Sequence, residues 1–158
     1  MYLRPPSEED GKSIWDLVKS TRVLDLNSAY SYLLLTKYYC DTCVVAEADG
    51  KIVGFVSAFQ PPRQAEVIFV WQVAVDEEFR RRRLGLNMLK HLLAREICSN
   101  CRYLELTVNP SNHAAFNLYY QLAHDLKTSC VEEECFPSRL FPGEKHEEEV
   151  MLRIGPLI

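Results

Sequence analysis

Apolar and polar residues alternate along this chain in runs whose lengths match strands and helices. Runs rich in β-branched and aromatic residues predict strands, and leucines or aromatics at three- and four-residue spacing predict helices. We expect strands over 2–4, 43–48, 52–59, 67–75, 103–108, 127–132 and 148–154. We expect helices that begin near residue 8, over 28–38, over 84–97 and over 112–123.

Turn residues divide these elements. Asp49-Gly50 is a strong hairpin signal, and Pro61-Pro62 ends the strand that follows it. The segment 136–146 contains two prolines and a glycine and is long enough to be functional. The resulting order is β-α-α-β-β-β-α-β-α-β-β. It predicts a single α/β domain over residues 1–158, with a mixed, mostly antiparallel sheet and helices on both faces.

The most distinctive segment is a buried strand that runs into four consecutive arginines, Arg80 to Arg83, and then into a helix. The first turn of a helix has unpaired N–H groups and the positive end of the helix dipole, so anions bind there. Arginine adds bidentate donors for phosphate. Acidic residues are usual at such a position, so the arginines indicate a strongly negative ligand, and we expect a diphosphate-bearing cofactor.

Charge and hydropathy narrow the class of protein. The chain has 47% hydrophobic and 25% charged residues, as an ordinary globular protein does. Its net charge is −4, so the arginines form a basic island on an acidic chain. A nucleic-acid-binding protein normally has a wider basic surface. The N-terminal residues lack the apolar core of a signal peptide, and no apolar run is long enough to span a bilayer. We therefore expect a cytoplasmic protein that binds neither nucleic acid nor membrane.

Six cysteines include two C-x-x-C pairs, Cys40/Cys43 and Cys98/Cys101. This spacing nominally matches a four-thiolate zinc site, but the segment between the pairs is much longer than in a small zinc knuckle. We interpret the cysteines as reduced thiols that fill helix ends and core gaps, and we expect no metal.

The pattern V-x-x-x-F-R-x-x-R-x-G over 75–85, followed by a helix, resembles the GNAT family of acetyl-CoA-dependent N-acetyltransferases. That family wraps the cofactor pyrophosphate with Arg/Gln-x-x-Gly-x-Gly/Ala. Here Arg80 and Gly85 match its ends, and Arg83 replaces the middle glycine. A second element, Asn112-x-x-Ala115-x-x-x-Tyr119, also fits. The resemblance implies acetyl-CoA as co-substrate and these cofactor-binding residues: Val73, Val75, Arg80, Arg81, Arg82, Arg83, Leu84, Gly85, Asn112 and Asn117.

Five further segments resemble the branch of this family that serves ectoine biosynthesis, namely 24–35, 42–50, 54–59, 69–75 and 149–156. This resemblance covers nearly the whole chain. It implies L-2,4-diaminobutyrate as the substrate and its γ-amino group as the acceptor, attacked directly in a ternary complex. The alternative is another small diamine or amino acid. Exposed aromatic residues such as Tyr38 and Tyr39 favour a homodimer.

Amine acetylation requires a site that binds a cation, removes a proton and stabilises an oxyanion. Local sequence favours Asp25 as the N-cap of a helix. The resemblance instead implies that Asp25 anchors a substrate amino group. Trp71 is either core or a pocket wall that faces an ammonium. His146 and Glu149 are candidates for substrate binding and proton acceptance, while Glu147 and Glu148 are interpreted as a solvated strand end.

The general base is left open among Asp25, His146, Glu149 and a relayed water. A backbone N–H of the strand 71–75 is a candidate for oxyanion stabilisation. Tyr119 is a candidate general acid for the leaving thiolate, or else a core tyrosine of an amphipathic helix. Asn109 is a pocket candidate that turn chemistry before Pro110 explains equally well. Two rival functions are an acyl-CoA-binding regulator without catalysis and nucleic-acid binding through the arginines.

Overall fold

The computed structural model describes residues 1–158 and contains every predicted strand and helix in the predicted order. The chain forms two compact units, residues 1–60 with 70–99 and residues 61–69 with 100–158. Strand β4 (Val67–Val75) contributes residues to both units. Hydrogen-bonded neighbours follow the order β1-β2-β3-β4-β5-β7-β6, with β4–β5 as the parallel pair. The predicted mixed sheet is confirmed.

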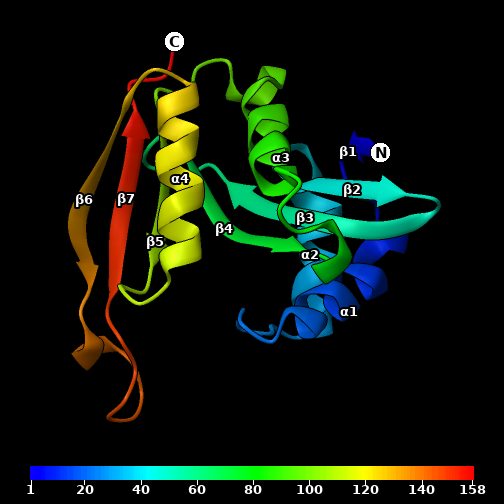
Figure 1. The fold of residues 1–158 in the computed structure, drawn as a ribbon, viewed down its shortest axis with the longest axis horizontal. Helices are drawn as coiled ribbons and strands as arrows, with labels where there is room; N and C mark the ends of the chain where they lie inside the picture. The colour runs from blue at the N-terminus through cyan, green and yellow to red at the C-terminus, as the bar shows by residue number, and fades with distance from the viewer. The chain divides into compact units, whose positions relative to one another are not determined.

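The first unit holds an antiparallel meander (Figure 1). The turn between β2 and β3 has positive φ at both central residues, 51° at Asp49 and 76° at Gly50, which confirms the predicted hairpin. Both residues tolerate this conformation better than a β-branched side chain would. The elements of this unit, besides β4, are β1 (Tyr2–Arg4), α1 (Gly11–Thr21), α2 (Ala29–Tyr38), β2 (Val44–Ala48), β3 (Lys51–Phe59) and α3 (Leu84–Leu93).

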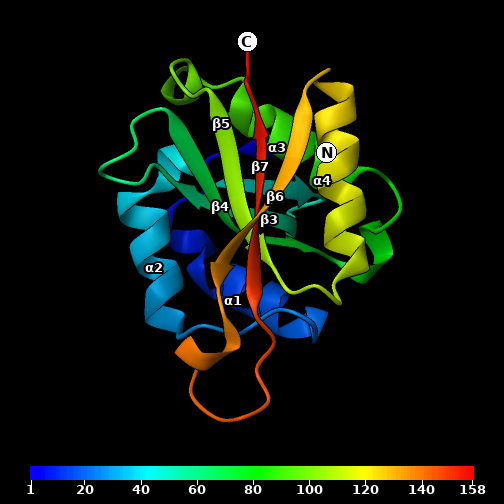
Figure 2. The same cartoon turned by 90° about the vertical axis from the view of Figure 1, so that its left-hand side faces the viewer.

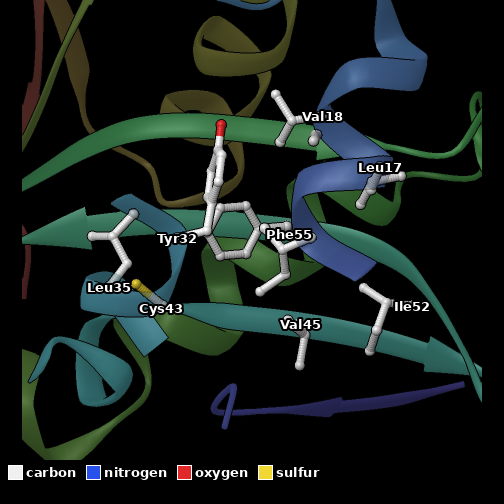
Figure 3. Close-up of a cluster of buried hydrophobic side chains, with 10 residues drawn as sticks. Leu17, Val18, Tyr32, Leu35, Cys43, Val45, Ile52 and Phe55 are labelled. Atoms are coloured by element: carbon white, nitrogen blue, oxygen red, sulfur yellow. The ribbon is translucent and has the colours of Figure 1, made fainter. Parts of the chain in front are cut away.

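Helices cover both faces of the first unit's sheet. On one face Phe55 of β3 packs edge-on against Tyr32 of α2, at 6.0 Å between ring centroids, within an apolar cluster drawn in Figure 3. On the other face Gly54 lies under α3, where an added Cβ would come within 2.9 Å of Met88. Strand β3 is therefore buried on both sides, which explains its continuous apolar sequence.

An ion pair closes the N-terminal end of the first unit. Arg4 donates to both carboxylate oxygens of Asp10, at 2.8 and 3.0 Å, and to Glu47 at 3.2 Å. Asp10 also accepts from the backbone N–H of Ser7 at 2.7 Å. These donors, Arg4 first, hold the pKa of Asp10 below its ordinary value. The pair fixes β1 to the start of α1.

The second unit contains β5 (Tyr103–Val108), α4 (His113–Asp125), β6 (Ser129–Phe136) and β7 (Glu149–Gly155). Strand β7 lies between β5 and β6 and is antiparallel to both. A long loop that includes the short 3₁₀ turn Ser138–Leu140 joins β6 to β7 and extends beyond the strands (Figure 2).

Two predicted boundaries were wrong. Helix α3 ends at Leu93, four residues before the predicted end at 97, because the backbone of Arg95 adopts an extended conformation. The Arg95 side chain then donates to the carbonyls of Asp41 and Cys43, at 3.0 and 2.6 Å. Strand β6 is longer than predicted, since its acidic residues pair with β7 up to Phe136.

Candidate active site

The arginine turn lies in the first unit between β4 and α3. Arg81 and Arg83 have left-handed backbones, with φ of 62° and 59°, a conformation that favours glycine. All four arginines are exposed. The Arg80 side chain donates to the Val75 carbonyl at 3.2 Å, and the Arg82 guanidinium lies 5.1 Å from the centre of the Phe79 ring. The turn therefore places cationic side chains at the surface immediately before a helix.

Helix α3 begins with backbone donors that its own hydrogen bonds do not use. Its first intrahelical bond runs from Asn87 N–H to the Arg83 carbonyl at 2.9 Å. The N–H groups of Leu84, Gly85 and Leu86 precede it and have no intrahelical acceptor. The helix has no acidic residue in its first turn and no side-chain cap. Together with the arginines, these amides suit the pyrophosphate expected from the sequence.

Strand β4 is the edge strand of the first unit over residues 70–75. The backbone N–H of Gln72 donates to Ser57 Oγ on β3 at 3.1 Å, so it points into the sheet. Because backbone groups alternate along a strand, the N–H groups of Trp71, Val73 and Val75 point to the outer edge. This edge could pair with a pantetheine arm, as expected for Val73 and Val75, or donate to an oxyanion.

Asp25 does not cap α2. The N-cap is Ser28, whose hydroxyl accepts from Ser31 N–H at 3.2 Å, and Asp25 lies three residues earlier in an exposed position. The interpretation of Asp25 as a helix cap is therefore wrong. Its carboxylate is left available for a ligand.

Gln72 holds the Asp25 loop in place. Its side-chain amide donates to the Asp25 carbonyl at 2.7 Å and accepts from the Tyr32 hydroxyl at 3.0 Å. Gln72 is 6% exposed and Tyr32 is fully buried, so their hydrogen bond is shielded from water, whereas the bond to the Asp25 carbonyl is partly buried. The sequence analysis missed Gln72 and Tyr32, although a polar residue inside the apolar run VIFVWQVAV was a visible signal.

Trp71 is 44% exposed, whereas its neighbour Gln72 is buried. Since side chains alternate along a strand, the two residues lie on opposite faces of β4. Trp71 is therefore not a core residue of the α1–α2 face. Its ring remains available as a pocket wall.

In the second unit, the turn that precedes α4 contacts residues of the C-terminal tail that the sequence analysis considered. The Glu147 carboxylate accepts from Ser111 N–H at 3.2 Å and from Ser111 Oγ at 2.5 Å. The Asn109 amide donates to the Glu148 carbonyl at 3.3 Å. Glu147 is exposed just before the start of β7, and its carboxylate also has a defined partner in Ser111. The side chain of Asn109 thus binds the main chain of the C-terminal tail.

His146 is held by its neighbours in the same loop. Its ring stacks on Phe141, with centroids 3.8 Å apart and planes inclined by 2°. Its Nδ1 lies 2.6 Å from the Glu147 carbonyl oxygen. Phe141 could not be predicted from the sequence, because its stacking on His146 depends on how the loop folds back.

Glu149 is half-buried at the first position of β7. Tyr119 is buried on α4, and desolvation raises the pKa of its hydroxyl above the ordinary value. Asn112 caps α4 by accepting from Ala115 N–H at 3.1 Å, and Asn117 is exposed on the same helix. The structure therefore assigns Asn112 a local capping contact.

None of the six cysteines forms a disulfide, and no three metal-ligating side chains lie together. Burial raises the pKa of the Cys43 thiol to about 11, so it is protonated near neutral pH. None of the helices is both long and apolar enough to cross a membrane.

Residues 12–123 match the acetyltransferase (GNAT) family, and the chain belongs to that family. Within this family, the chain is 49% identical over 153 residues to the L-2,4-diaminobutyric acid acetyltransferase of Halalkalibacterium halodurans. This alignment covers 96% of this chain and 80% of that protein. It is 45% identical to the enzyme of the same name from Shouchella clausii, over 99% and 88% of the two chains.

A solved structure agrees with these relatives. The diaminobutyrate acetyltransferase EctA of Paenibacillus lautus, in complex with its substrate L-2,4-diaminobutyric acid and coenzyme A, superposes with a TM-score of 0.95 at 41% identity. The match covers 99% of this chain and 95% of that one. The Ard1 structure from Thermoplasma volcanium, at 19% identity and a TM-score of 0.76, shares the fold.

The Gln72 network yields a prediction about the Asp25 loop. Gln72→Leu removes the acceptor of the buried Tyr32 hydroxyl and the side-chain donor to the Asp25 carbonyl, so we expect a loss of about 1–3 kcal/mol in the free energy of unfolding. Amide hydrogen exchange over residues 24–28 should become faster. Ser57→Ala is the matched control, since it removes a contact of Gln72 that does not reach the loop. Unchanged exchange at 24–28 in Gln72→Leu would contradict the assignment.

Proposed function

We infer that this chain transfers the acetyl group of acetyl-CoA to the γ-amino group of L-2,4-diaminobutyrate, a step of ectoine biosynthesis. The observation that carries the inference is the match to the Paenibacillus lautus enzyme, which was solved with this substrate and coenzyme A and superposes over nearly the whole chain. Curated relatives of the same name, at 45–49% identity, support the same substrate.

Acetyl-CoA supplies an activated thioester carbonyl, and the first unit carries the groups that would hold the cofactor. We propose that the exposed arginines and the N–H groups at the start of α3 bind its pyrophosphate. The outer edge of β4 would pair with the pantetheine arm through Val73 and Val75. An outward N–H of the same edge would stabilise the oxyanion that forms when the amine attacks.

The substrate amine is a cation before it reacts, with a reference pKa of about 10.4 for an alkylammonium. We propose that the Asp25 carboxylate binds an amino group and that Trp71 forms a wall of the pocket. The reacting nitrogen must lose one proton to the protein or to water. Asp25, His146 and Glu149 are the candidate acceptors, with a relayed water as the fourth.

Attack of the neutral amine on the carbonyl carbon forms the C–N bond, and the C–S bond then breaks to release the coenzyme A thiolate. We propose Tyr119 as the acid that assists this thiolate. Burial raises the pKa of the Tyr119 hydroxyl, so full proton transfer from it to the thiolate is unfavourable and Tyr119 would assist mainly by donating a hydrogen bond. A thiol has a pKa of only about 8.5, so the leaving group needs little acid assistance.

Incubation of the protein with acetyl-CoA and L-2,4-diaminobutyrate tests the function directly. We expect N-γ-acetyl-diaminobutyrate and free coenzyme A in equal amounts, identified by NMR of the product. Ornithine, lysine and a polyamine are the comparison substrates, and they should turn over more slowly. Binding of acetyl-CoA without transfer to any amine would favour a regulator, and faster turnover of another diamine would favour a related enzyme.

The proposed roles rank the effects of substitution. Asp25→Ala and Glu149→Ala should each lower kcat/KM by roughly 100-fold or more, since a group that binds or deprotonates the amine contributes about 10²–10⁴-fold. Tyr119→Phe should lower it less, because the thiolate leaves readily. Steady-state kinetics with both substrates varied measures this order. The reverse order, with Tyr119→Phe nearly inactive and Glu149→Ala active, would reject the assignment.

We further propose that residues 1–158 act as one acetyltransferase domain, in the cytoplasm, as a homodimer. Six cysteines without a disulfide are typical of a reducing compartment. Helix α2 is apolar on its outer side as well as its inner side, which is unusual for a helix facing water. Its exposed residues line a hollow of about 280 Å³: Tyr30, Leu33, Leu34 and Tyr38, with Glu8 and Lys37.

The two charges on this α2 surface, Glu8 and Lys37, pair with each other at 3.8 Å, so a second copy could cover the apolar residues without burying a lone charge. Leu33→Glu should therefore convert a dimer into a monomer in sedimentation velocity at micromolar concentration. Val131→Glu, an equally exposed apolar position on β6, is the control and should leave the dimer intact. A monomeric unmodified protein would contradict the proposal.

A further inference from the structure

The loop between β6 and β7 is held at its C-terminal end by the turn that precedes α4. Ser111 donates from both its N–H and its hydroxyl to the Glu147 carboxylate, and the 2.5 Å hydroxyl contact is typical of a charge-assisted bond. Asn109 adds a bond to the next carbonyl, that of Glu148. These contacts fix the main chain on the C-terminal side of His146.

The other side of His146 faces an aromatic ring that is also fixed. A 3₁₀ turn over Ser138–Leu140 directs Phe141, whose N–H donates to the Ser138 carbonyl at 3.1 Å. The imidazole of His146 lies parallel to the Phe141 ring, 3.8 Å away. The stack fixes the plane of the imidazole, since it covers one face of the ring.

The hydrogen bond of His146 then determines its tautomer. Nδ1 lies 2.6 Å from the Glu147 carbonyl oxygen, and a carbonyl oxygen can only accept. Nδ1 must therefore carry a proton, which leaves the lone pair of the neutral imidazole on Nε2. His146 is exposed, so the ring can reach a ligand.

We propose that Phe141 and Glu147 are positioning residues that present His146 Nε2 as the hydrogen-bond acceptor for the amino group of the substrate. The proposal rests on the function proposed above and deepens it, because it names the atom of His146 that meets the amine and the two residues that orient it. Phe141 acts through the stack, and Glu147 acts through its carbonyl oxygen and through the anchor at Ser111.

The first experiment reads the tautomer without any substrate. Long-range ¹H–¹⁵N NMR of the imidazole nitrogens should show His146 protonated at Nδ1, whereas the Nε2-protonated tautomer predominates for histidine in water. The signal is assigned among the four histidines by its loss in His146→Asn. In Phe141→Leu the signal should shift toward the average of the two tautomers. An Nε2-protonated His146 in the unmodified protein would overturn the proposal.

The second experiment measures turnover of the full chain. Phe141→Leu should lower kcat/KM for L-2,4-diaminobutyrate by roughly tenfold, because a misdirected group loses much of its effect. The KM for acetyl-CoA should stay unchanged, and Phe141→Tyr should restore the rate. Phe136→Leu, at an exposed phenylalanine of β6, is the matched control with no expected effect.

The two experiments separate the possible failures. If the tautomer is as predicted but His146→Asn acetylates diaminobutyrate at the normal rate, the proposed role of His146 is overturned, while the acetyltransferase function stands. If Phe141→Leu changes neither the tautomer nor kcat/KM, Phe141 is not a positioning residue. If no amine is acetylated by the unmodified protein, the proposed function itself is rejected.

Discussion

One side-chain amide connects the sheet of the first unit to the loop that carries its acidic site residue. Gln72 is buried within the apolar strand β4, where an unpaired amide would be costly, and it uses its donor on Asp25 and its acceptor on Tyr32. Tyr32 is in turn packed against Phe55. The position of the Asp25 main chain therefore follows from the core, and an exposed carboxylate is supported by buried contacts. Buried contacts of this kind hold a charged side chain in one geometry, which a binding site requires.

The second unit supports its own candidate residues differently. No buried amide holds His146; instead, the carboxylate of Glu147 and the ring of Phe141 act from within the same exposed loop. Exposed hydrogen bonds contribute less to stability than buried ones, so this arrangement depends on several contacts acting together. Buried and exposed support thus coexist in one small protein, and each serves residues of the predicted site.

Most of the fold could be predicted from the sequence because its elements have strong local signals. The β-branched run of β4 and the Asp49-Gly50 turn each specify their structure within a few residues, whereas the cap of α2 was predicted at Asp25 and lies at Ser28. The early end of α3 could not be predicted, since it depends on Arg95 reaching carbonyls over fifty residues away in the chain. In the site, the substrate role of Asp25 came from the family resemblance, whereas His146 was a candidate from the residues of the C-terminal tail. Ser111 and Phe141 act through tertiary contacts that no local pattern encodes, whereas Gln72 stands out as a polar residue in an apolar strand although its partners do not.

The turn before α3 combines two kinds of anion donor that respond differently to salt. Exposed guanidinium groups are screened as ionic strength rises, because the Debye length falls from about 10 Å at 0.1 M to about 3 Å at 1 M. The N–H groups at the helix start act over hydrogen-bond distances of about 3 Å, which do not exceed the Debye length at 1 M salt. Salt therefore screens their contacts less. Arg83, which adopts a backbone conformation suited to glycine, adds a further charge to the salt-sensitive part. If this turn binds the cofactor pyrophosphate as proposed, concentrated salt would weaken the long-range attraction by the guanidinium groups more than the short-range hydrogen bonds of the helix N–H groups.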